Sequence, residues 1–80
     1  MTTNDILTDL FKQHECFTIH AYYDIIIDLT IRGEKMQAKE KFNLLPRVNQ
    51  KDFVKQLFFG NISNIYLQKT DKEMFFDLIK

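Results

Sequence analysis

Three side chains near the start of the sequence could bind a soft metal ion: His14, Cys16 and His20. A closed zinc site takes four ligands, so an acidic side chain would have to supply the fourth. The residues around Cys16 and His20 have the pattern of a β-strand, on which positions four apart are separated by about 13 Å. Two side chains at that separation cannot reach one ion, so the sequence predicts no metal site.

Nucleophilic catalysis would need Cys16 or a serine beside a histidine that an acidic group orients. Ser63 is the only serine and falls in a predicted turn. His20 and Asp24 share one face of the predicted strand but are too far apart along it for a hydrogen bond. The two glycines cannot form a phosphate-binding loop, and the acidic residues are scattered rather than paired across a cleft. We therefore expect that the protein is not an enzyme and that it has neither catalytic residues nor a cofactor.

The outer face of a predicted β-hairpin combines basic residues with an aromatic one, as single-stranded nucleic-acid sites do. These residues are Lys35, Lys39, Lys41, Arg32, His20 and Tyr22. Asp24 and Asp28 share the same face, however, and 11 basic residues are balanced by 11 acidic ones. Nonspecific nucleic-acid affinity comes from surplus positive charge. Single-stranded nucleic-acid binding is therefore kept as the alternative function.

The same predicted face contains one apolar residue, Ile26, beside Tyr22 and opposite Lys41. A small hydrophobic centre inside a charged rim is typical of a protein interface. The edges of a sheet also offer strand pairing to a partner. We therefore predict a partner-binding surface made of His20, Tyr22, Ile26, Lys39 and Lys41.

Eighty residues with 45% hydrophobic content indicate a single small domain, residues 1–80. A chain of this length buries only about 60% of its unfolded surface, which favours dependence on a partner or a homodimer. The single cysteine favours a reducing cytoplasm. The first residues lack the pattern of an export signal, and no apolar run approaches the roughly 20 residues of a membrane helix. We expect a cytoplasmic protein without a membrane partner.

Alternation of apolar and polar residues over residues 17–31 predicts a β-strand. Residues 36–44 alternate in the same phase except at Glu40, and Gly33-Glu34 between the two runs suits a two-residue hairpin turn. The resulting register pairs Ile31 with Met36, Leu29 with Ala38, Ile25 with Phe42, Tyr23 with Leu44 and Asp28 with Lys39. Both faces of the hairpin are consistent in this register. Residues 16–22 remain without a partner strand, so either the chain bends near Tyr22-Tyr23-Asp24 and pairs internally, or that segment pairs with another molecule. We favour the bend.

Two helices are predicted from their end signals. The first covers residues 4–14, capped by Thr2 or Thr3, with Asp5 in its first turn. The second covers residues 50–59, with Asn49 as its N-cap. The remaining signals around the second helix are Pro46 before it, Asp52 in its first turn, Val48 packing on Phe53, and Gly60 at its end.

The last part of the chain has two interpretations. Residues 65–69 alternate and predict a strand, whereas residues 70–79 fit a helix that begins with a capping box. They also fit a second strand that returns after Asp71-Lys72, and this hairpin is favoured because it supplies the sheet with neighbours. The predicted fold class is α+β, in the order α-β-β-α-β-β. It consists of a small antiparallel sheet built on a long hairpin with two helices on one face, or with a helical last element.

Residues with AT-rich codons dominate the composition: Phe, Tyr, Met, Ile, Asn and Lys account for 37 of 80 residues. Such a bias indicates a low-GC bacterium or one of its phages. In its size and its helix-plus-hairpin architecture the chain resembles phage-encoded inhibitors of host enzymes, anti-CRISPR proteins among them. The resemblance carries over no functional residue. It implies a non-catalytic inhibitor or adaptor that acts on a host or phage protein.

Overall fold

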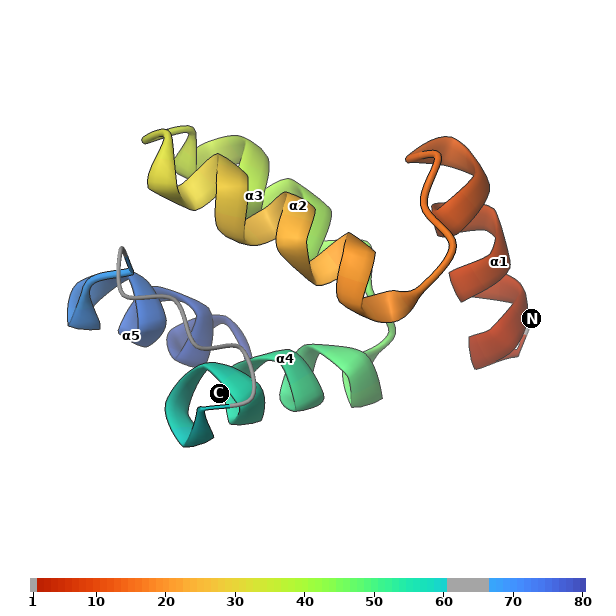
Figure 1. Ribbon diagram of the computed structural model, residues 1–80. Helices are drawn as coiled ribbons and strands as arrows, with labels where there is room; N and C mark the ends of the chain where they lie inside the picture. The colour runs from red at the N-terminus through yellow and green to blue at the C-terminus, as the bar shows by residue number, and fades with distance from the viewer. Residues whose placement is uncertain (1, 61–66) are drawn as a thin grey trace.

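The computed structural model describes residues 2–60 and 67–80, which form five α-helices and contain no strand. The helices are α1 (Thr3–Gln13), α2 (Ile19–Ile31), α3 (Lys35–Asn43), α4 (Arg47–Phe59) and α5 (Lys69–Leu78). Helices α2 and α3 form one antiparallel pair, α4 and α5 form a second, and α1 packs beside α2 at one end (Figure 1). The predicted α+β fold, with its antiparallel sheet, is therefore wrong.

Helix α2 replaces the strand predicted over residues 17–31. Its buried positions follow the helical period: Tyr22, Tyr23, Ile26, Ile27, Leu29 and Thr30. Asp24 and Asp28, four residues apart, lie on the exposed side. The helix begins where the Thr18 side chain accepts a hydrogen bond of 3.1 Å from the Ala21 backbone N–H. Packing of this face against the core outweighs the β-propensity of the many branched residues.

The chain reverses at Gly33-Glu34 as predicted, but the turn joins two helices instead of two strands. Gly33 has a φ of 84°. Its N–H donates to the Thr30 carbonyl (3.1 Å), and the Glu34 N–H donates to the Leu29 carbonyl (2.9 Å). These two bonds form the motif that commonly ends an α-helix at a glycine. Helix α3 then buries Ala38 and Phe42, four residues apart, so the strand predicted over 36–44 is also wrong.

The first and fourth helices lie where the sequence predicts them. Helix α1 differs by one residue at each end from the predicted 4–14, and Thr2 and Asp5 cap it reciprocally with two bonds of 3.2 Å. Helix α4 ends at Gly60, which has a φ of 91°. It begins three residues earlier than predicted, with Pro46 rather than Asn49 in the N-cap position.

Helix α5 confirms the helical alternative for the end of the chain, and the favoured C-terminal hairpin is wrong. The helix begins with a bond of 3.2 Å from the Gln68 N–H to the Asp71 carboxylate, so its capping box starts two residues before the predicted one at Thr70. Of the strand predicted over 65–69, residues 65 and 66 lie outside the described residues, and Lys69 already belongs to α5.

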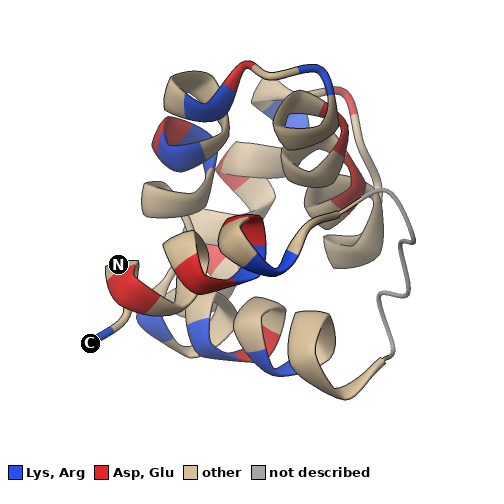
Figure 2. Cartoon of the chain, turned by 90° about the vertical axis from the view of Figure 1, so that its left-hand side faces the viewer, with Lys and Arg blue, Asp and Glu red and all other residues tan. Residues whose placement is uncertain are grey.

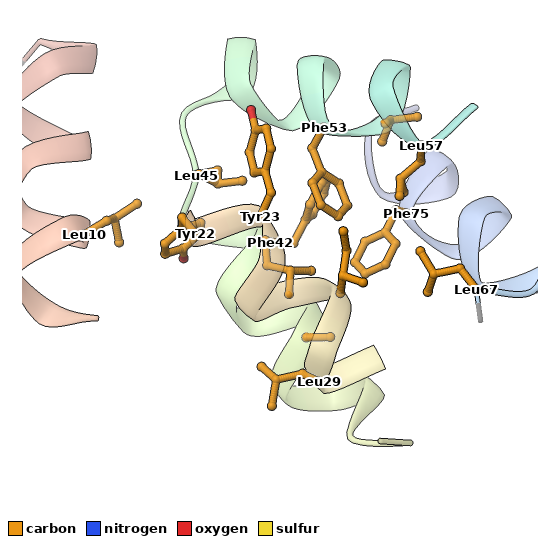
Figure 3. Packing of buried hydrophobic residues seen from close by; sticks show 14 of the residues in the cluster. Leu10, Tyr22, Tyr23, Leu29, Phe42, Leu45, Phe53, Leu57, Leu67 and Phe75 are labelled. Carbon is orange, nitrogen blue, oxygen red and sulfur yellow. The ribbon is translucent and has the colours of Figure 1, made fainter. Parts of the chain in front are cut away.

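One aromatic residue from each of α2, α3, α4 and α5 meets at the centre of the core (Figure 3). The ring centroids of Phe42, Phe53 and Phe75 are 5.2 to 5.6 Å apart. Tyr23 lies 5.1 Å from Phe53, and all four residues are fully or almost fully buried. Tilted and edge-to-face pairs at these distances add stabilisation beyond the burial of area.

Polar contacts fix the rotation of α4 about its axis. The Gln50 amide donates to the carbonyl of Phe42 (3.3 Å) in the last turn of α3 and to that of Leu45 (3.0 Å) just beyond the helix. The Arg47 guanidinium donates to the Ile79 carbonyl at the end of α5. Because Gln50 and Phe53 face inward, the opposite side of α4 faces solvent.

Candidate protein-docking groove between helices α4 and α5

An open groove of about 610 Å³ lies between the antiparallel helices α4 and α5. Apolar side chains dominate its lining, with charged side chains at its rim. The lining residues are Lys51, Val54, Lys55, Phe58 and Phe59 from α4 and Glu73, Phe76 and Ile79 from the segment of α5 and its C-cap. We refer to it as the α4–α5 groove.

Three phenylalanines expose large apolar area around the α4–α5 groove. Phe59 is 78% exposed, and Phe58 and Phe76 are 44% and 43% exposed. Phe58 and Phe76 contact each other edge to face across the two helices, with ring centroids 6.0 Å apart. A cluster of exposed aromatics rimmed by charge is a mark of an interaction site rather than of ordinary surface.

The α4 side of the groove is positively charged. Arg47, Lys51 and Lys55 follow one another at intervals of four residues and are exposed. Figure 2 colours the Lys and Arg positions of the chain blue. Asp52, the one acidic residue of α4, is turned inward: its carboxylate accepts from the Tyr23 hydroxyl (2.9 Å) and the Gln56 amide (2.7 Å). Within the described residues, neither Lys51 nor Lys55 makes an ion pair.

The α5 side carries acidic groups that lysines of the same helix or its end already contact. The Glu73 carboxylate lies 3.9 Å from the Lys69 ammonium, and the Asp77 carboxylate lies 3.1 Å from that of Lys80. Lys80 also sits 5.2 Å from the centroid of the Phe76 ring. The groove therefore has an apolar floor, one cationic wall and one wall whose charges are mutually compensated.

The structure separates the five predicted partner-binding residues. Tyr22 and Ile26 are 0% exposed and belong to the core, so their predicted position on an outer face is wrong. His20 and Lys39 are exposed on α2 and α3, and Lys41 is half-buried. Only Tyr22 and Lys41 are joined, by a bond of 2.6 Å from the Tyr22 hydroxyl to the Lys41 backbone carbonyl. The predicted nucleic-acid face thereby loses its aromatic residue.

Burial makes the Tyr22 hydroxyl a weaker acid than an exposed tyrosine. Desolvation, with a smaller contribution from nearby Cys16, raises the pKa of Tyr22 from 10.0 to about 12. Burial and the hydrogen bond to Asp52 also raise the pKa of Tyr23. Both groups are therefore held protonated in the folded state at pH values at which they ionise in the unfolded chain.

We predict that the fold loses stability in alkaline solution between pH 10 and about 12. The folded state retains the Tyr22 proton where the unfolded state has released it, so the stabilisation is complete below pH 10 and disappears as the pH rises through 12. Because the Tyr22 hydroxyl is only part-buried, solvent screens some of this effect, and the expected loss is about 1 to 2 kcal/mol. Urea unfolding at a series of pH values measures the loss. Tyr22→Phe should make the slope shallower, and equal slopes in the two proteins would contradict the assignment.

Groups with other chemistry do not assemble into a site in the described part of the chain. No three His, Cys, Asp or Glu side chains there come together as metal ligands. Cys16 is buried, which raises the pKa of its thiol and disfavours the reactive thiolate. Ser63 lies outside the described residues. None of the described helices combines the length and the apolar character that crossing a membrane requires.

The sequence-based prediction missed the residues of the α4–α5 groove, although a signal was present. Phe58-Phe59 and Phe75-Phe76 are consecutive pairs. Neighbouring positions on a helix point about 100° apart, so a helix with one buried stripe tends to expose one member of such a pair. Phe75 is buried and Phe76 is half-exposed, as this reasoning requires.

No family model matches the chain, and neither a curated protein nor a solved structure matches it. The groove and its charges are therefore the basis for a functional proposal.

Proposed function

We propose that this chain is a non-catalytic protein-binding module whose α4–α5 groove takes up an apolar segment of a partner protein. The observation that carries the proposal is the exposure of Phe58, Phe59 and Phe76 around one apolar groove. Aromatic anchors in a pocket supply most of the energy of many protein interfaces. A groove between two antiparallel helices suits an amphipathic segment of a partner.

The charges of the groove specify the partner further. Lys51 and Lys55 line one wall, Arg47 lies one turn before them on α4, and the two lysines have no acidic contact in the described chain. A partner segment with carboxylates beside its apolar anchors would compensate these charges. Complementary charges of this kind mainly speed association and select the partner. We therefore propose an acidic amphipathic segment as the binding partner.

A protein partner explains the groove better than a single-stranded nucleic acid does. Phe58 and Phe76 pack against each other edge to face, whereas base stacking uses a free aromatic face. Glu73 lies on the opposite wall, where its carboxylate would repel a phosphate backbone. The basic and acidic residues of the whole chain are equal in number. These features favour binding to protein.

The resemblance to phage-encoded inhibitors included a helix-plus-hairpin architecture, and the described residues contain no hairpin of strands. The architectural part of that resemblance is therefore wrong. An inhibitory or adaptor role toward a host protein stays a prediction from size and composition, and the groove supports only the binding of a protein segment.

Selection of displayed random peptides tests the proposed function. Peptides selected on the protein should contain aromatic or aliphatic anchors at helical spacing together with Asp or Glu. Their affinity should fall at least about tenfold for Phe76→Ser, since a buried aromatic anchor contributes about 2 kcal/mol or more. Isothermal titration calorimetry with one synthetic selected peptide provides the measurement.

Met36→Ser is the matched control, because Met36 is 77% exposed and does not line the groove. It should leave the affinity for the peptide unchanged. Equal losses in both variants, or peptides that bind Phe76→Ser as tightly as the original protein, would overturn the α4–α5 groove as the binding site.

A further inference from the structure

The zero net charge of the chain conceals a strong separation of charge along it. Residues 2–34 contain six acidic and two basic side chains, and residues 35–60 contain six basic and two acidic ones. The first part forms α1 and α2, and the second forms α3 and α4. Two copies of such a molecule attract each other when the acidic part of one meets the basic part of the other.

The exposed side of α2 carries an aromatic residue followed by carboxylates. Phe17, which precedes the Thr18 N-cap, is 94% exposed, the highest exposure among the large hydrophobic residues of the described chain. Asp24 and Asp28 follow it by seven and eleven residues and are also exposed. Asp24 and Asp28 are one turn apart and lie on one side of α2, and Phe17 stands just before the first turn of the same helix. We call these three residues the acidic stripe.

The exposed side of α4 carries the complementary pattern in the opposite direction. Lys51 and Arg47 precede Phe58 by seven and eleven residues, and all three are exposed. We call these residues the basic stripe. Placed antiparallel, the two helices align Asp24 with Lys51 and Asp28 with Arg47, and this leaves Phe17 at the end of the basic stripe that carries Phe58. His20 falls opposite Lys55 in this alignment, and that pair adds no attraction.

We propose that a second copy of this chain docks its acidic stripe on the basic stripe, with its Phe17 in the α4–α5 groove. This inference rests on the proposed function, because it uses the same groove and the same partner chemistry. Phe17 would then bury its exposed ring against Phe58, and Lys51 would gain the carboxylate it lacks. Asp28 already pairs with Arg32 at 3.0 Å, but both side chains are more than half exposed, so exchanging that partner costs little.

The fold determines how such contacts propagate. The inner sides of α2 and α4 face each other, since Tyr23 contacts both Asp52 and Phe53. The acidic and basic stripes therefore point to opposite sides of the molecule. One contact leaves an unused acidic stripe on one copy and an unused basic stripe on the other. A head-to-tail contact that does not close continues to add copies.

Sedimentation equilibrium as a function of protein and salt concentration tests the inference. The monomer mass is 9.6 kDa. At about 50 mM salt the average mass should increase with protein concentration beyond that of a dimer, and at about 500 mM salt it should fall toward the monomer, because salt screens exposed charges. Phe17→Ser should weaken the association at least about tenfold.

A charge exchange provides the decisive variants, since all the positions are exposed. Asp24→Lys and Lys51→Glu should each abolish the association, whereas the double variant should restore it. Circular dichroism confirms that each variant folds. Failure of the double variant to associate would overturn the alignment, and a monomeric mass for the original protein at every concentration would overturn self-association itself.

The outcomes separate this inference from the proposed function. If the protein stays monomeric yet binds selected peptides in a Phe76-dependent manner, the proposed function stands and only self-association through the groove is overturned. If the protein neither associates nor binds such peptides, both the proposed function and the self-association inference are overturned.

Discussion

Replacement of Ile26 with lysine is expected to unfold the protein. Ile26 is 0% exposed and lies on the inner side of α2. A lysine there would place an unpaired ammonium in the core, which costs several kcal/mol even when the group is driven to its neutral form. A domain of this size is stable by only about 4 to 12 kcal/mol in total. The helical circular dichroism signal at room temperature should therefore largely disappear.

Asp24→Lys is the matched control for Ile26→Lys, because it introduces the same side chain two residues earlier on the exposed side of α2. Its free energy of unfolding should stay within about 0.5 kcal/mol of the original. The two substitutions also separate a helix from a strand. If residues 17–31 formed the predicted strand with Ile26 on its solvent face, Ile26→Lys would fold normally.

The segment around Ile26 fits a strand and a helix almost equally well. Between Ile19 and Ile31 nearly every residue other than Asp24 and Asp28 is apolar or weakly polar, so both a period of two and a period of 3.6 fit most positions. Strict alternation required Ile26 to be exposed, and the helix buries it. The single apolar exception was evidence against the strand, and the four-residue spacing of the two aspartates was evidence for the helix.

The parts of the fold that could be predicted have local causes. Reciprocal capping by Thr2 and Asp5 determines the start of α1, and the positive φ of Gly60 determines the end of α4. Gly33 likewise identifies a reversal of the chain. Such signals depend on a few neighbouring residues. The type of element joined at Gly33 depends instead on which side chains reach the core, and that is set by contacts distant in the sequence.

The α4–α5 groove could not be predicted because its two walls are distant in sequence and unrelated by any local motif. Phe58 and Phe76 meet only because α5 packs antiparallel to α4. The charge of the groove depends on tertiary structure in the same way. Asp52 would neutralise Lys51 and Lys55 if it faced outward, but its bonds to Tyr23 and Gln56 hold it inside. A formal charge count therefore says little about the surface potential of a small fold.

Phe53→Ala is expected to cost about 3 to 5 kcal/mol of stability, the usual range for a buried aromatic truncated to alanine. Phe53 is 0% exposed and is the residue of α4 that contacts aromatic rings from three other helices: Tyr23, Phe42 and Phe75. The cavity left at their meeting point would loosen α2, α3 and α5 together. Urea unfolding followed by circular dichroism should show a midpoint well below that of the original protein.

Phe59→Ala removes the same group from the same helix at a position that is mostly exposed, and it should change stability by less than about 0.5 kcal/mol. Phe53→Leu should cost less than Phe53→Ala, since it keeps most of the buried volume. Similar losses for Phe53→Ala and Phe59→Ala would mean that α4 is rotated from the orientation described. The contrast matters for function as well, because that orientation places Phe53 in the core and leaves Phe58 and Phe59 at the groove. Variants on the two sides of α4 can therefore separate loss of binding from loss of folding.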